Sequence, residues 1–138
     1  MFGSRTILIA DGSTYAALDL AAAVEANGGR VAGPVQTLAE AGAILGSSRI
    51  AGAIVDCELD DATELVLRLA EAGVPVIAQT SIPLPASLQE LDGRLPVMMR
   101  PIDAGKVIAT LAHEIDESDM RNEMCLVPGP GPAAPSLK

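Results

Sequence analysis

The amino-terminal segment reads Thr6-Ile7-Leu8-Ile9-Ala10 and then breaks at Asp11-Gly12-Ser13. A continuous apolar run of this length is typical of a parallel strand that is covered on both faces. The three residues that follow favour a loop. Residues 15–27 then have the composition of a helix that ends at Gly28-Gly29. This unit of strand, loop and helix indicates an α/β fold.

The same alternation continues along the chain. Further strands are predicted at residues 30–35, 50–55, 74–78 and 95–99, and further helices at 37–47, 61–72, 86–91 and 104–116. Thr37 and Glu40 have the spacing of a capping box, and Asp61 gives another helix-start signal. Pro34 lies within the second strand, and proline is tolerated there mainly at the edge of a sheet.

Strands that alternate with helices predict a parallel sheet with helices on both faces, joined by right-handed crossovers. We therefore expect a five-stranded α/β domain over residues 1–118. Residues 119–138 contain the run Pro128-Gly129-Pro130-Gly131-Pro132, a composition that cannot bury a core. We therefore expect these residues to form a disordered tail.

Composition excludes several classes of partner. The 138 residues include 18 acidic against 9 basic side chains, for a net charge of −9, so nucleic acid and anionic membranes are not expected as direct partners.

No apolar run reaches the roughly 20 residues needed to cross a bilayer. Cys57 and Cys125 lie too far apart for a metal-binding or redox CxxC pair. We expect a cytoplasmic protein with reduced thiols.

Polar side chains follow four of the predicted strands. Asp11 follows the first strand and Asp56 the third, while Thr80 follows the fourth and Arg100 the fifth. In an open α/β sheet, ligands bind beyond the carboxyl ends of the strands. The alternation therefore predicts that two carboxylates, a hydroxyl and a cation gather at one edge of the sheet.

The segments that carry these residues are Ile7-Leu8-Ile9-Ala10-Asp11, Ala53-Ile54-Val55-Asp56, Pro75-Val76-Ile77-Ala78-Gln79-Thr80 and Val97-Met98-Met99-Arg100-Pro101. In this order and spacing, the sequence resembles the receiver domain of two-component response regulators over residues 5–116. The resemblance implies a flavodoxin-like, doubly wound fold with the strand order 2-1-3-4-5.

The resemblance also implies a role for each site residue. Asp56 is the expected phospho-acceptor, whose carboxylate attacks a phosphoryl group. Thr80 is expected to bond a phosphoryl oxygen, and Arg100 to pair with another. A Mg²⁺ ion is expected on the carboxylates of Asp11 and Asp56 and on the backbone carbonyl of Glu58.

Three positions depart from the receiver pattern. Gly12 stands where receivers usually carry a second acid, and we expect this loss to weaken the Mg²⁺ site. Arg100 replaces the usual lysine, which keeps the charge but changes the geometry. Val97 stands at the position of the switch aromatic, three residues before Arg100, so signalling through a rotating ring is not available. Glu58 adds a negative charge that can either compensate for Gly12 or repel phosphate.

Each candidate also has a purely structural interpretation. Asp56 and Thr80 can simply end their strands, and Arg100 can be a surface cation. Asp11 can cap the first helix, a role that is also open to Ser13. These alternatives stay open at the level of sequence.

The leading hypothesis is a single-domain response regulator that accepts a phosphoryl group on Asp56 from a histidine kinase or phosphotransfer protein. It would signal through contacts with a downstream regulator protein, and its chemistry would be limited to self-phosphorylation and dephosphorylation. The alternative is a pseudo-receiver, a protein-binding module that works without phosphorylation.

A nucleotide-binding or hydrolytic enzyme is disfavoured, because no glycine-rich phosphate loop is present. The single histidine, His113, is expected on a solvated helix face. The sequence leaves homodimerisation open.

Overall fold

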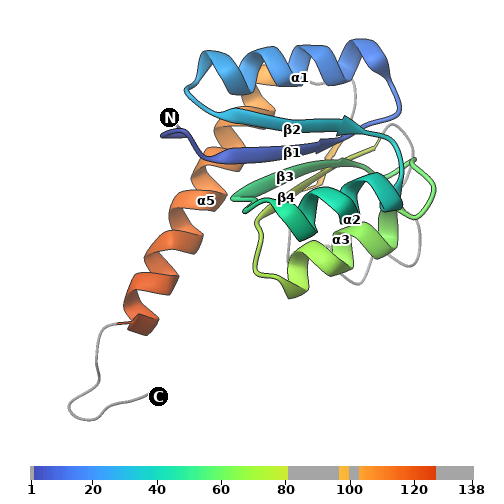
Figure 1. The fold of residues 1–138 in the computed structure, drawn as a ribbon. Helices are drawn as coiled ribbons and strands as arrows, with labels where there is room; N and C mark the ends of the chain where they lie inside the picture. Colours follow the sequence, from blue (N-terminus) through green and yellow to red (C-terminus); the bar gives the residue numbers. More distant parts are fainter. Residues whose placement is uncertain (1, 81–96, 100–102, 127–138) are drawn as a thin grey trace.

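Five parallel strands form one sheet in the computed structural model, which describes residues 2–80, 97–99 and 103–126 (Figure 1). The strands are β1 (Thr6–Ala10), β2 (Arg30–Val35), β3 (Gly52–Asp56), β4 (Val76–Thr80) and β5 (Val97–Met99). Their order across the sheet is β2-β1-β3-β4-β5, and every neighbouring pair is parallel. The predicted fold class and strand order are confirmed.

Four helices in the described part of the chain cover the two faces of the sheet. They are α1 (Thr14–Ala26), α2 (Leu38–Ser47), α3 (Ala62–Glu71) and α5 (Ala104–Leu126). Helices α1 and α5 pack together on one face, and α2 and α3 pack together on the other (Figure 1). The helix predicted at residues 86–91 lies outside the described residues, as do the first two residues of the predicted strand 95–99.

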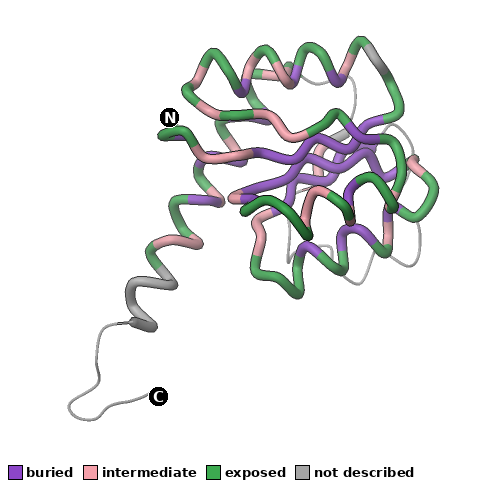
Figure 2. The backbone as a smooth tube through the Cα atoms, in the orientation of Figure 1, coloured by how far each residue is buried: buried purple, intermediate pink, exposed green. Residues whose placement is uncertain are grey.

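The sheet is buried on both sides, as the apolar runs predict. In β1, Leu8 and Ala10 pack into the core on the α2–α3 side, whereas Ile7 and Ile9 pack into the core on the α1–α5 side. This is the period-two alternation of a strand. The central strands accordingly form the most continuous buried region in Figure 2. Burial of each large aliphatic side chain contributes roughly 1.5–3 kcal/mol, and this stabilises the layered arrangement.

The start of α2 follows the predicted capping box. The hydroxyl of Thr37 accepts the Glu40 N–H at 3.1 Å, and the Glu40 carboxylate accepts the N–H of Gln36 at 2.9 Å. The start of α3 differs, because Asp61 is its N-cap residue but makes no side-chain capping bond and has a φ of 63°. Pro34 lies in β2, which is an edge strand, in agreement with the prediction.

Helix α5 is longer than predicted. It ends at Leu126 rather than near residue 116, so residues 119–126 are helical instead of belonging to the tail. In the acidic stretch of residues 114–119, Ile115 is buried and Asp119 forms an ion pair with Arg5 at 2.6 Å. The end of α5 projects past the sheet in Figure 1. Among the described residues, no helix is long and apolar enough to cross a membrane.

Candidate functional site at the carboxyl edge of the sheet

Two carboxylates are buried side by side at the carboxyl edge, the edge where the parallel strands end. Asp11 directly follows β1, and Asp56 is the last residue of β3. The register pairs Ala10 with Val55, so the two acids occupy equivalent positions on adjacent strands. Asp11 is 1% exposed and Asp56 is 5% exposed. The structure therefore brings these two predicted residues together.

Backbone N–H groups hold both carboxylates in place. Oδ1 of Asp11 accepts the N–H of Ser13 at 2.8 Å, and Oδ1 of Asp56 accepts the N–H of Glu58 at 2.9 Å. Aspartate commonly bonds the backbone two residues ahead in this way. Burial of a carboxylate is costly unless it is hydrogen-bonded, and these bonds offset part of that cost. Ser13 rather than Asp11 caps α1, since its hydroxyl accepts the Ala16 N–H.

Thr80 ends β4 beside Asp56. The register pairs Asp56 with Gln79, so Thr80 lies one residue beyond that pair, and it is 2% exposed. A buried hydroxyl is thus placed on the strand adjacent to the predicted acceptor. This position is compatible with a purely structural role of Thr80 at the end of its strand. It is equally compatible with the predicted hydrogen bond from Thr80 to a phosphoryl oxygen.

Gln79 is a polar residue that the sequence analysis did not single out. It is 4% exposed and pairs across the sheet with Asp56, whereas its neighbours in β4 are apolar or end the strand. The alternation of side chains puts Asp11, Asp56 and Gln79 in one row across three adjacent strands. The signal was present in the sequence, because an amide interrupts an otherwise apolar buried strand.

Gly12, the position of the missing acid, faces an apolar neighbour. A Cβ atom built on Gly12 would lie 3.1 Å from Cδ2 of Leu59, and the Leu59 side chain packs against the core on the α2–α3 side. The turn after β3 holds Leu59 there, because its N–H donates to the Asp56 carbonyl at 3.1 Å. The space beside Gly12 is thus bounded by a methyl group.

Of the three remaining predicted residues, two are described and one is not. Glu58 is exposed, next to Asp56 in the turn that follows β3. Val97 is partly buried in β5, opposite Ala78, and packs against the core on the α2–α3 side. Arg100 lies outside the described residues, so its pairing with phosphate stays a prediction.

A small pocket opens beside Asp11. It has a volume of about 230 Å³ and is lined by residues of the start of α1 and of the segment from β2 to α2: Asp11, Ala17, Leu18, Pro34 and Gln36. Next to it, Tyr15 is 85% exposed and Leu18 is 55% exposed. Exposed apolar side chains therefore border the carboxyl edge on the α1 side.

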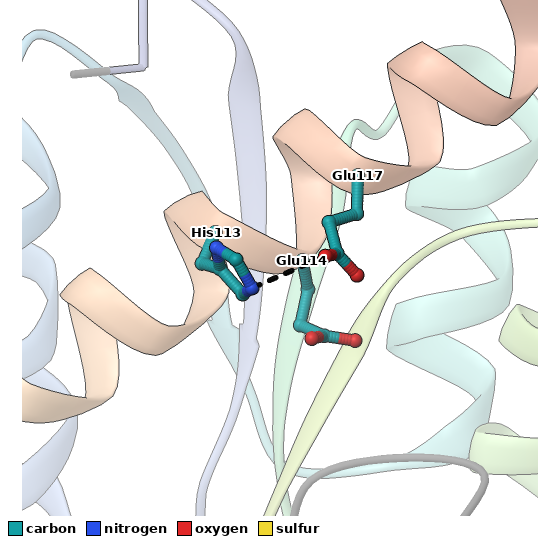
Figure 3. Close-up of side chains that lie close together, drawn as sticks. All are labelled: His113, Glu114 and Glu117. Carbon is teal, nitrogen blue, oxygen red and sulfur yellow. Dashed lines mark ion pairs between the residues drawn. The ribbon is translucent and has the colours of Figure 1, made fainter.

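One compact group of metal-binding side chain types lies elsewhere. Among the described residues, the only three His, Cys, Asp or Glu side chains with ligand atoms all within 4.8 Å of one another are His113, Glu114 and Glu117 (Figure 3). They lie on α5, and His113 Nε2 is 3.4 Å from a Glu117 oxygen. Neighbouring Ile115 packs against Gly52 at the start of β3, so this group is near the opposite edge of the sheet.

We compared the chain with protein-family models, with curated protein sequences and with solved structures. Neither a protein-family model nor a curated protein sequence matches the chain. Solved structures do match. A CheY-like response regulator receiver domain from Methanospirillum hungatei JF-1 has a TM-score of 0.75 at 20% identity, covering 86% of this chain and 98% of that one. The chain has the fold of a response regulator receiver domain.

Two further receiver structures show how widely this fold extends among diverged sequences. The receiver domain of a modulated diguanylate cyclase from Desulfovibrio desulfuricans G20 has a TM-score of 0.75 at 24% identity, with coverage of 86% and 98%. A response regulator from Burkholderia pseudomallei, solved with a phosphorylated aspartic acid, calcium ion and citrate, has a TM-score of 0.65 at 18% identity, with coverage of 91% and 76%. The receiver fold implied by the sequence resemblance is therefore confirmed.

Proposed function

We propose that this chain is a phospho-accepting receiver, in which Asp56 takes a phosphoryl group from a histidine kinase or a phosphotransfer protein. The observation that carries the proposal is the pair of buried carboxylates, Asp11 and Asp56, at the carboxyl edge of a receiver fold. Two acids in adjacent strands are expensive to bury. Their retention is expected where a cation and a phosphoryl group are to be bound.

In the proposed reaction, a carboxylate oxygen of Asp56 attacks the phosphorus of a phosphohistidine. The P–N bond breaks, the histidine nitrogen keeps the electron pair, and an aspartyl phosphate forms. The bond from the Glu58 N–H fixes the orientation of the attacking carboxylate. The Thr80 hydroxyl would donate to a phosphoryl oxygen, and Arg100 would pair with another.

The residues at this edge fit a Mg²⁺ ion. Carboxylate and carbonyl oxygens are the ligands that Mg²⁺ prefers, and Asp11 and Asp56 supply two carboxylates in one buried pair. The backbone carbonyl of Glu58 would be the third protein ligand. When bound, the ion neutralises charge on the phosphoryl oxygens during transfer. Gly12 leaves one protein carboxylate fewer than usual, so we propose weak binding.

Downstream signalling would proceed through protein contacts. The exposed Tyr15 and Leu18 lie on α1 beside the acceptor edge, where a donor or regulator protein can bury them. Aromatic side chains are frequent anchors at such interfaces. Tyr15 is one of only two aromatic residues in the chain.

The direct test is phosphorylation with acetyl phosphate and Mg²⁺, followed by intact-mass measurement. The wild type should gain one phosphoryl group, and Asp56→Asn should not. Asp60→Asn is the matched control, because Asp60 is an exposed acid in the turn just after β3 and should leave labelling unchanged. Labelling that persists in Asp56→Asn would remove Asp56 from the role.

A second candidate function is favoured by Gly12, which stands where receivers usually carry a second acid and which the side chain of Leu59 borders. In a pseudo-receiver the same fold would bind a protein partner without phosphorylation, and the loss of the second acid is the change expected of such a module. NMR titration with Mg²⁺ and beryllofluoride separates the two functions. Saturable shifts at Asp56 and Thr80 support the phospho-acceptor, and their absence supports the pseudo-receiver.

A further inference from the structure

The edge of the sheet opposite Asp56 carries a different set of charges. Arg5 precedes β1, Arg30 begins β2, and Arg49 comes shortly before β3. Because the strands are parallel, these three positions lie at the same edge, which we call the amino edge. The sheet thus has carboxylates at one edge and guanidinium groups at the other.

A pocket of about 510 Å³ opens at the amino edge. Its walls come from the starts of β1, β3 and β4 and from α5. The polar side chains that line it are Ser4, Arg5, Thr6, Arg49, Ser118 and Asp119. The volume is in the usual range of small-molecule sites, and several hydrogen-bond donors converge there.

Arg5 already binds an oxyanion in this pocket. Its Nη2 lies 2.6 Å from Oδ2 of Asp119, and its Nη1 donates to the Phe2 carbonyl at 3.2 Å. The second bond holds the guanidinium group in a fixed orientation. Arg5 is therefore a prepared site for a carboxylate or phosphate, at present satisfied by a residue of α5.

Arg49 is the second cation of the pocket. Its side chain is exposed, and within the described residues it takes part in no ion pair. In a chain with twice as many acidic as basic residues, most of the surface repels anions. A guanidinium that has no acidic partner within the described part of the chain, in a concave site that holds a second guanidinium, is where an anion would bind.

We propose that this pocket binds a small oxyanion ligand with at least two anionic groups, a polycarboxylate or an organic phosphate. One group would pair with Arg49, and another would compete with Asp119 for Arg5. The described lining holds no aromatic side chain, since Phe2 is in the core and Tyr15 is on α1, so recognition rests on the anionic groups and not on base stacking. A ligand bound here would also loosen the ion pair between Arg5, just before β1, and Asp119 of α5.

The experiment uses citrate and inorganic pyrophosphate as separate probes, because each carries at least two anionic groups, without Mg²⁺ and at low ionic strength. Binding is followed by NMR shifts and calorimetry on the full chain. Saturable shifts at residues 4–6, 49–51 and 118–119 are expected, and the probe that binds more tightly identifies the ligand as carboxylate or phosphate. Shifts confined to the Asp11–Asp56 edge, or no saturable shift with either probe, would overturn the proposal.

Three variants make the test specific. Arg49→Ala should weaken binding at least tenfold. Arg30→Ala, at the same edge but outside the pocket lining, should leave binding unchanged. Asp119→Asn removes the internal competitor and should tighten binding several-fold, an effect that a merely structural role of Asp119 would not produce. Equal losses in the two arginine variants, or no gain in Asp119→Asn, would refute a site built on Arg5 and Arg49.

Discussion

The substitution Gly12→Asp tests most directly how the acidic site is adapted. It restores a carboxylate to the position that follows Asp11, beside the buried pair of Asp11 and Asp56. Two unit charges about 4 Å apart interact by about 1 kcal/mol in water and by about 4 kcal/mol at an effective dielectric constant of about 20. Gly12 is exposed, so the lower value applies, and a divalent cation doubles it to about 2 kcal/mol. We therefore expect Gly12→Asp to bind Mg²⁺ at least tenfold more tightly than wild type.

The same substitution should destabilise the metal-free protein. The new Cβ atom would lie 3.1 Å from Leu59 Cδ2, closer than the ordinary carbon–carbon contact of about 3.5–4.0 Å. Leu59 must move by a few tenths of an ångström to admit this atom, and repulsion from Asp11 adds to the cost. Leu59→Ala removes the crowded methyl group, so the double variant should lose less stability than the sum of the two single variants.

Calorimetric titration with Mg²⁺ measures the affinity, and urea unfolding with and without Mg²⁺ measures the stability. Gly46→Asp is the matched control: it adds the same charge on α2, at a position where a Cβ atom meets no other atom within 4 Å. An affinity for Mg²⁺ in Gly12→Asp within twofold of wild type would refute the placement of the ion beside Asp11. An equal gain in Mg²⁺ affinity in Gly46→Asp would show that the effect comes from net charge alone.

Three further outcomes are expected. Thr80→Ala should slow labelling by acetyl phosphate whereas Thr80→Ser keeps it near wild type, because the hydroxyl is the group required; equal rates in both would contradict the role. Gly52→Ala should cost about 1–3 kcal/mol in urea unfolding, since its Cβ would lie 2.9 Å from Ile115 Cδ1, and Ile115→Val should relieve part of that cost. Strict additivity would refute the contact. Thr37→Ala should cost about 1 kcal/mol through loss of the α2 cap, measured in the same assay.

The sheet and its carboxyl edge follow from simple patterns in the sequence. Continuous apolar runs such as residues 6–10 identify strands buried on both faces, and the residue after each run must lie at the same edge of a parallel sheet. The sequence therefore predicts that Asp11, Asp56 and Thr80 lie at one edge of the sheet, and all three are buried there. The strand order came instead from the family resemblance, because alternation alone does not determine which parallel strands are neighbours.

Other features depend on contacts that no local pattern contains. The end of α5 was placed too early because its acidic residues look like a solvated terminus, yet Asp119 is matched by Arg5 from the far end of the sequence. Asp61 has the residue type of a helix cap, but its φ is 63° and its side chain makes no capping bond. The amide of Gln79 is visible in the sequence as an interruption of an apolar strand, but its pairing with Asp56 depends on the register between β3 and β4.

The contact between Gly12 and Leu59 bears on which of the two functions is correct. Gly12 is exposed, and the apolar side chain of Leu59, held by the β3–α3 turn, borders it on one side. The acidic pair nonetheless stays buried and hydrogen-bonded, although two carboxylates without a function are costly to keep in a core. Both observations are satisfied by a site that still accepts a phosphoryl group but binds its metal weakly, so that occupancy depends on the concentration of free Mg²⁺. The titration of Gly12→Asp and wild type against Mg²⁺ therefore also measures how tightly the proposed natural site binds the ion.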